Sequence, residues 1–144
     1  MTNTPKWIPS VTELKEAGVK FKANKEKNFL DVTFHDGVLE IPVVGLYDRT
    51  EPILRNLIAF EQCFKDTNYL VTYYTLFMDC LLHSSQDVLI LQKKEIVINW
   101  VSDEVEAARL FNQLGIEVYC DVKDNYLWRL FTEFDLDQYA NVTR

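Results

Sequence analysis

The sequence predicts a mainly helical α+β domain, with five or six helices packed around a buried core helix and one small antiparallel β-hairpin. The core helix is predicted at about residues 69–83, where every residue from Tyr69 to Leu82 except Thr72, Thr75 and Asp79 is apolar or aromatic. The hairpin is predicted at about residues 29–41, where apolar and polar residues alternate on both sides of a turn sequence. The length of 144 residues and the hydrophobic fraction of 48% suit one globular domain, residues 1–144, with its own core.

The first helix is predicted from a capping box. Ser10 stands at the N-cap position and Glu13 three residues later, so the side chain of each can bond to the backbone N–H of the other. Gly18 suits the position just after a helix, where the backbone often turns left-handed. A short helix from Val11 to Ala17 follows, and the alternating residues 19–22 then predict a brief strand beside the hairpin, in a three-stranded meander.

The hairpin has the clearest local signal in the chain. Leu30, Val32 and Phe34 alternate with polar residues, and the apolar pattern returns at residues 38–41. Asp36-Gly37 supplies the two positive-φ positions of a type I′ turn. Pro42 cannot donate to a strand ladder, so the second strand is expected to end there.

The second helix is predicted from Asp48 to about Phe64, with Pro52 tolerated in its first turn. Its apolar residues fall into two adjacent rows. One row contains Ile53, Leu57, Phe60 and Phe64, and the other contains Leu54 and Ile58.

The polar residues of the core helix share one narrow stripe. Thr72, Thr75, Asp79 and His83 follow helical spacing, which leaves the rest of the circumference apolar and therefore buried against neighbouring elements. We interpret the stripe as a solvated or capped side of the helix. Its alternative role is chemical, because Asp79 and His83 are four residues apart and a carboxylate at that spacing can orient an imidazole as an acid/base pair.

The remaining elements are predicted more coarsely. Ser84 to Asp87 breaks the chain with N-cap chemistry. Further helices are expected at residues 88–100, bent around Glu95, at 102–114, closed by Gly115, and at 126–139, with 116–122 either a short strand or an extended linker.

Composition restricts the function. The net charge of −7 argues against nucleic acid as a ligand, because phosphate contacts need clustered Lys and Arg. The chain as written shows no signal peptide and no apolar run of transmembrane length, which predicts a soluble, cytoplasmic protein. Cys63, Cys80 and Cys120 form no CxxC pair and are expected to be reduced.

The search for reactive or ligand-binding motifs yields only weak candidates. We expect no catalytic residues, no cofactor and no metal, and the acid/base pair of Asp79 and His83 is the one alternative for an enzyme. Two histidines without a Cys pair cannot build an ordinary zinc site. Asn141 begins a glycosylation triplet, Asn-Val-Thr, which matters only if this part of the chain is lumenal.

Several segments together resemble one plant protein family. They are Thr12–Lys22, Leu30–Phe34, Gly37–Pro42, Thr50-Glu51, Arg55–Cys63, Met78–Leu81, Asp87-Val88, Asn99-Trp100 and Leu110–Leu114. In this order they resemble the C-terminal half of the plant family called domain of unknown function 247, a group of uncharacterised proteins. The chain differs in having Glu95 where the family more often has Gly.

The resemblance implies recognition rather than catalysis. Family members are usually about three times longer, with a helical N-terminal part and a C-terminal helix that spans the plasma membrane, both absent here, and some are linked to self-incompatibility in grasses. We therefore expect a non-enzymatic recognition or interaction module, either whole or as a truncated gene product. The expected partner is a protein, either the missing N-terminal half of the family domain or a second copy. The surplus of Phe, Tyr and Trp further predicts an exposed apolar patch.

Overall fold

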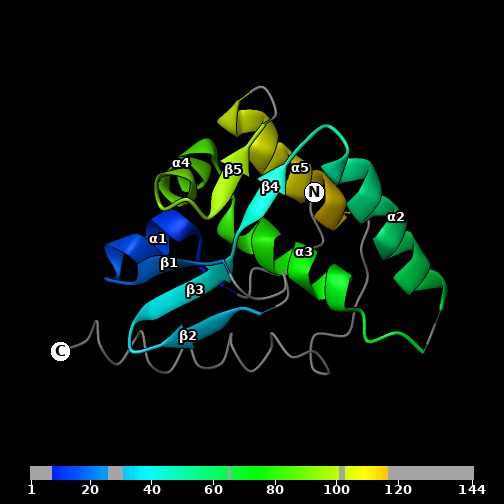
Figure 1. The fold of residues 1–144 in the computed structure, drawn as a ribbon, viewed down its shortest axis with the longest axis horizontal. Coiled ribbons are helices and arrows are strands. Elements are labelled where there is room, and N and C mark those ends of the chain that lie inside the picture. Colours follow the sequence, from blue (N-terminus) through cyan, green and yellow to red (C-terminus); the bar gives the residue numbers. More distant parts are fainter. Residues whose placement is uncertain (1–7, 26–30, 65, 101–102, 117–144) are drawn as a thin grey trace.

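A computed structural model describes residues 8–25, 31–64, 66–100 and 103–116 (Figure 1). These residues contain five helices and five strands. In chain order the elements are α1 (Val11–Glu16), β1 (Lys20–Asn24), β2 (Thr33–His35), β3 (Val38–Pro42), β4 (Val44–Leu46), α2 (Thr50–Cys63), α3 (Leu70–Leu81), α4 (Ser85–Lys93), β5 (Val97–Asn99) and α5 (Glu104–Ile116). The mixed α+β class is as predicted, and the helices predicted at residues 11–17, 48–64, 69–83 and 102–114 are present as α1, α2, α3 and α5.

The predicted capping box and helix end of α1 are confirmed. The Ser10 hydroxyl accepts a hydrogen bond from the Glu13 backbone N–H, and the Glu13 carboxylate accepts one from the Ser10 backbone N–H. Gly18 has a φ of +96°, the left-handed conformation expected just after a helix. Val11 and Leu14 are the residues that α1 buries, so this short helix is held both by its caps and by packing.

The hairpin is present in the described residues, but the predicted meander is wrong. β2 pairs antiparallel with β3, and both Asp36 (φ +52°) and Gly37 (φ +76°) adopt the positive φ values of a type I′ turn. β1 lies on the other side of β3 and is parallel to it, in the order β1-β3-β2. This order sets Phe21 and Phe34 on either side of the fully buried Leu39, whereas a meander would leave Leu39 on an edge strand.

A second, two-stranded parallel sheet joins distant parts of the chain. β4 pairs with β5 in the register Val44↔Val97, so residues 97–99 are a strand and not the end of a bent helix at 88–100. The helix α4 ends at Lys93 because Glu95 takes a left-handed conformation (φ +61°), and a β-branched run follows. Gly is the residue best suited to that conformation, so Glu95 is expected to be strained there.

Helix α3 is almost entirely buried, and its polar stripe is buried as well. Every residue from Thr72 to Leu81 is buried, and α3 contacts both α2 and α5 (Figure 1). Thr72, Thr75 and Asp79 are therefore not a solvated side, so of the two predicted interpretations of the stripe, solvated or capped, the solvated one is wrong. Glu61 of α2 lies on this side of α3, where it accepts hydrogen bonds from the backbone N–H and the hydroxyl of Thr72.

Helix α5 also runs further than its sequence suggests. Gly115 is buried inside the helix, which continues to Ile116, so Gly115 does not close it. Residues 117–122 and the helix predicted at 126–139 lie outside the described residues. α5 contacts α2, α3 and α4 and completes the core through Ala107, Ala108, Leu110, Phe111 and Leu114.

Candidate functional site

Helix α2 is apolar on two adjacent sides, and only one of them packs on the domain. Leu54 and Ile58 are buried against the core, together with Glu61. The second row is Ile53, Leu57, Phe60 and Phe64, which we call the outer face of α2. These side chains keep 54%, 43%, 55% and 53% of their surface exposed. The sequence identified both rows, but which row faces the core depends on the packing of α2 against α3 and α5.

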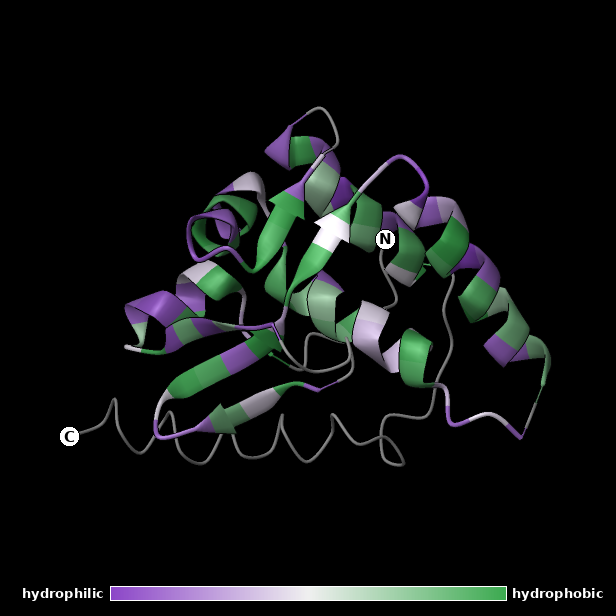
Figure 2. Ribbon diagram, viewed as in Figure 1, coloured by the Kyte–Doolittle hydropathy of each residue, from purple (hydrophilic) through white to green (hydrophobic). Residues whose placement is uncertain are grey.

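The outer face is uncharged. Glu51 and Arg55, which form an ion pair one turn apart, lie on the opposite side of the helix axis by the 100° step per residue. Pro52, Asn56 and Cys63, which flank the outer face, are exposed and uncharged, whereas the exposed Arg49 lies four residues before Ile53, at the N-terminal end of the row. In Figure 2, α2 alternates between hydrophobic and hydrophilic residues along its length, as expected for a helix with distinct sides.

Two aromatic side chains extend this surface beyond the start of α2. Tyr47 and Trp100 are 53% and 64% exposed, and their rings are nearly parallel, 9° apart in plane, with centroids separated by 6.0 Å. Together with Ile53 they line a hollow of about 480 Å³, which we call the aromatic hollow. Its remaining lining residues are Asp48, Arg49 and Thr50. The aromatic hollow therefore connects the exposed aromatic pair to the outer face of α2.

The ring of Tyr47 is held over the backbone of β4. A Cβ atom at Gly45 would lie 2.6 Å from a ring carbon of Tyr47, so only glycine leaves room for the ring in this position. The Thr50 hydroxyl accepts a hydrogen bond from the Tyr47 backbone N–H, at 2.9 Å. The segment before α2 thus presents Tyr47 in a defined orientation beside Trp100.

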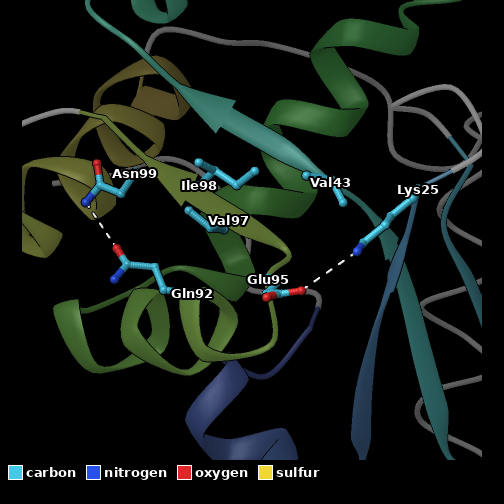
Figure 3. Close-up of a pocket in the computed structure, with 7 residues that line it drawn as sticks. All are labelled: Lys25, Val43, Gln92, Glu95, Val97, Ile98 and Asn99. Atoms are coloured by element: carbon cyan, nitrogen blue, oxygen red, sulfur yellow. Dashed lines mark hydrogen bonds and ion pairs between the residues drawn. The ribbon is translucent and has the colours of Figure 1, made fainter.

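A separate pocket lies beside β5 and has mixed chemistry (Figure 3). Its volume is about 580 Å³, and its walls carry the side chains of Lys25 and Glu95, which form an ion pair at 3.7 Å. On the other side, the Asn99 side-chain amide donates to the Gln92 side-chain oxygen at 3.1 Å. The polar groups of this pocket thus bond to one another, and the apolar floor is formed by Val43, Val97 and Ile98.

The predicted acid/base candidates differ in their surroundings. Asp79 is buried within α3, whereas His83 is exposed and lies two residues beyond the end of the helix at Leu81. The helical spacing that suggested an aligned pair therefore does not extend to His83. Asn141 lies outside the described residues. Within those residues, no group of three or more His, Cys, Asp or Glu side chains is placed to hold a metal ion.

Two buried carboxylates that bind backbone groups, those of Glu61 and Asp87, were not predicted from the sequence. The Glu61 carboxylate of α2 accepts hydrogen bonds from the backbone N–H groups of Val71 and Thr72, at 2.9 and 2.8 Å, and from the Thr72 hydroxyl at 2.6 Å. It therefore caps the start of α3, where Tyr69 provides no side-chain cap. No local pattern could reveal Glu61, because its partners are ten and eleven residues away.

The second buried carboxylate, Asp87, joins the starts of two helices. It accepts hydrogen bonds from the backbone N–H and hydroxyl of Thr12 in α1, at 2.7 and 2.5 Å. It also accepts from the backbone N–H and hydroxyl of Ser84, at 2.9 and 3.1 Å, and so closes the capping box of α4. The spacing of Ser84 and Asp87 could reveal the hydrogen bonds between these two residues, but not the bonds from Thr12 to Asp87. Thr12, Glu61 and Asp87 all belong to the segments that carry the family resemblance.

The fold and these surfaces define a small α+β domain with an exposed, uncharged apolar helix face. The chain belongs to the domain of unknown function 247 family, described as a plant protein of unknown function, whose pattern matches residues 1–142. The chain is 34% identical over 113 residues to the putative UPF0481 protein At3g02645 of Arabidopsis thaliana, covering 77% of this chain and 21% of that protein. It is 30% identical over 127 residues to the UPF0481 protein At3g47200 of the same plant, covering 86% of this chain and 27% of that protein.

The chain thus spans about a fifth to about a quarter of the length of these curated relatives. No solved structure matches it significantly. In the part of the chain that the structure describes, no helix is both long enough and apolar enough to cross a membrane.

Proposed function

We propose that this domain is a non-enzymatic recognition or interaction module of a plant protein, and that the outer face of α2 is its binding surface. The observation that carries the proposal is the uncharged row of Ile53, Leu57 and Phe60 on α2 and Phe64 at its C-cap, each about half exposed. Rows of this kind, spaced three and four residues apart, are how helices dock onto other proteins.

Burial of this row by a partner would release substantial free energy. Full burial of one large apolar side chain contributes about 1.5–3 kcal/mol, so covering the exposed half of each side chain contributes roughly 1 kcal/mol per residue. Tyr47 and Trp100 add aromatic area at one end of the row, where aromatic residues are frequent energetic centres of interfaces. The surface is therefore large enough to support specific binding of a protein.

The partner class follows from chemistry and from the family. The net charge of −7 disfavours nucleic acid, and the apolar row favours an apolar surface of another protein or of a further part of a longer chain. The curated relatives are much longer than this chain, so their additional residues are one candidate to cover the outer face. Recognition in processes such as grass self-incompatibility is a biological setting consistent with such a module.

The geometry supports this proposal better than an acid/base site at Asp79 and His83. A general acid/base pair needs both groups to face one substrate within hydrogen-bonding reach. Asp79 is buried in α3, while His83 is exposed after the helix has ended. The two residues thus lack the shared helical side on which the enzyme alternative was based.

The test is affinity capture from plant tissue with the full chain and two matched variants. Leu57→Glu places a charge in the centre of the outer face, and Gln62→Glu places the same charge on an exposed position on the other side of α2. We expect Leu57→Glu to lose the captured protein and Gln62→Glu to retain it. Equal capture by wild type and Leu57→Glu would exclude the outer face as the binding surface.

A further inference from the structure

The outer face of α2 is complementary to itself when two copies are antiparallel. Its two aliphatic residues, Ile53 and Leu57, lie in the N-terminal half of the row, and its two aromatic residues, Phe60 and Phe64, lie in the C-terminal half. Antiparallel packing about the centre of the row places Ile53 opposite the second copy's Phe64, and Leu57 opposite its Phe60. Every layer then combines a smaller with a larger side chain, which is how well-packed layers interdigitate. Parallel packing would instead place Phe against Phe and Ile against Ile.

The aromatic hollow lies where the antiparallel arrangement needs a receiving site. Phe64 is exposed at the C-terminal end of the row, and its ring contacts that of Phe60 with centroids 4.5 Å apart. The hollow lined by Tyr47, Ile53 and Trp100 lies at the N-terminal end. A two-fold axis through the centre of the row therefore brings the Phe64 ring of each copy to the aromatic hollow of the other copy. The same contact thus forms at both ends of the interface.

The area and the charge of the surface are compatible with such a pair. The six half-exposed side chains of the outer face and the aromatic pair each present on the order of 100 Å², or about 600 Å² of apolar surface per copy. This is at the lower end of specific interfaces, which bury about 1,200–2,000 Å² in total, and at the upper limit for the largest patch of a typical monomer. The outer face carries no charge, and the aromatic hollow adds one acidic and one basic residue, Asp48 and Arg49, so the contact surface has no net charge despite the net charge of −7.

From these three features, and resting on the function proposed above, we propose that two copies of this chain associate through an antiparallel α2–α2 contact, with Phe64 of each copy in the aromatic hollow of the other. The interface is isologous, because the same residues contribute from both copies. At this area the association is weak, in the micromolar range, and concentration-dependent.

The first arm of the test is sedimentation velocity of the 144-residue chain over a hundredfold range of concentration. We expect the wild-type chain and Gln62→Glu to shift from monomer to dimer together. Leu57→Glu and Phe60→Lys should each remain monomeric over the same range, because each homodimer would bury its new charge twice. Far-ultraviolet circular dichroism should be unchanged, since both substituted positions are exposed. A wild-type chain that stays monomeric, or a Leu57→Glu variant that dimerises like wild type, would overturn the proposal.

The second arm tests the direction of packing. In an antiparallel pair, Glu at position 57 of one copy faces Lys at position 60 of the other, and the remaining layers keep their native residues. An equimolar mixture of Leu57→Glu and Phe60→Lys should therefore dimerise at least tenfold more tightly than either variant alone. If the mixture stays monomeric while the wild type dimerises, the antiparallel contact is refuted. A monomeric wild type that still captures a plant protein through Leu57 would refute the dimer and leave the interaction module standing.

Discussion

Removing the Asp87 carboxylate should destabilise the domain far more than removing an ordinary helix cap. Asp87 is 1% exposed and accepts four hydrogen bonds, two from Thr12 and two from Ser84. Asp87→Ala leaves the backbone N–H groups of both partners without an acceptor, at the starts of α1 and α4. Because these two helices contact each other, both caps and their mutual packing depend on one side chain.

The size of the effect follows from the cost of each lost bond. A hydrogen bond to a charged group contributes about 1.5–3 kcal/mol, and an unpaired N–H costs about 1–3 kcal/mol where water cannot reach it. Ser84 is exposed, so water can replace part of its loss, whereas the Thr12 contact is partly buried. We therefore expect Asp87→Ala to lower the free energy of unfolding by about 2–4 kcal/mol.

Asp103→Ala is the matched control. Asp103 also accepts a hydrogen bond from a backbone N–H at the start of a helix, that of Glu106 in α5, but it is exposed and serves one helix only. Its loss should cost about 0.5–1 kcal/mol. Urea unfolding followed by circular dichroism gives both values from the midpoints at constant slope. If Asp87→Ala costs no more than Asp103→Ala, the two-helix role of Asp87 is refuted.

Four further substitutions test other parts of the fold by the same urea unfolding. Glu61→Ala removes the cap of α3 from two backbone N–H groups and should cost about 2–4 kcal/mol; a cost below 1 kcal/mol would contradict that role. Thr75→Val should be neutral or stabilising by about 1 kcal/mol, because the buried Thr75 hydroxyl has no partner among the described residues, whereas Thr72→Val should destabilise by losing the bond to Glu61. Gly37→Val should cost about 1–3 kcal/mol through strain at φ +76°, and an unchanged midpoint would show that the turn tolerates a side chain.

Elements with local sequence signals were predicted accurately. The start of α1 is determined by a four-residue motif, the capping box from Ser10 to Glu13. The hairpin turn is determined by two residues, Asp36 and Gly37. The physical reason is that capping and turn formation depend on the conformations of neighbouring residues. Such signals act regardless of where the rest of the chain packs.

Elements that depend on distant partners were predicted wrongly or missed. Residues 97–99 are a strand because β4 offers them a partner, and β1 pairs parallel with β3 in a register that sets Phe21 beside Leu39. The spacing in these segments is compatible with more than one structure, and tertiary pairing decides between them. Gly115 was also predicted wrongly, because it lies buried inside α5 and does not end the helix.

The candidate surface was predictable in composition but not in placement. The two apolar rows of α2 are visible in the sequence, but both could have been buried in a larger core. The carboxylate of Glu61 turns the Leu54–Ile58 row inward, since its hydrogen bonds to α3 fix the rotation of α2 about its axis. Ile53 and Phe60 are exposed as a consequence.

The pairing of β4 with β5 has a consequence for how the protein emerges from the ribosome. Val44 finds its partner only when Val97 has been synthesised, about 50 residues later. At translation rates of 5–20 residues per second, β4 remains without its partner strand for roughly 3–10 s. During that interval the nascent chain presents an unpaired strand edge, a feature that attracts chaperones. Contacts of such long sequence separation also slow folding, so the nascent domain is expected to need this protection until α4 and β5 have been made.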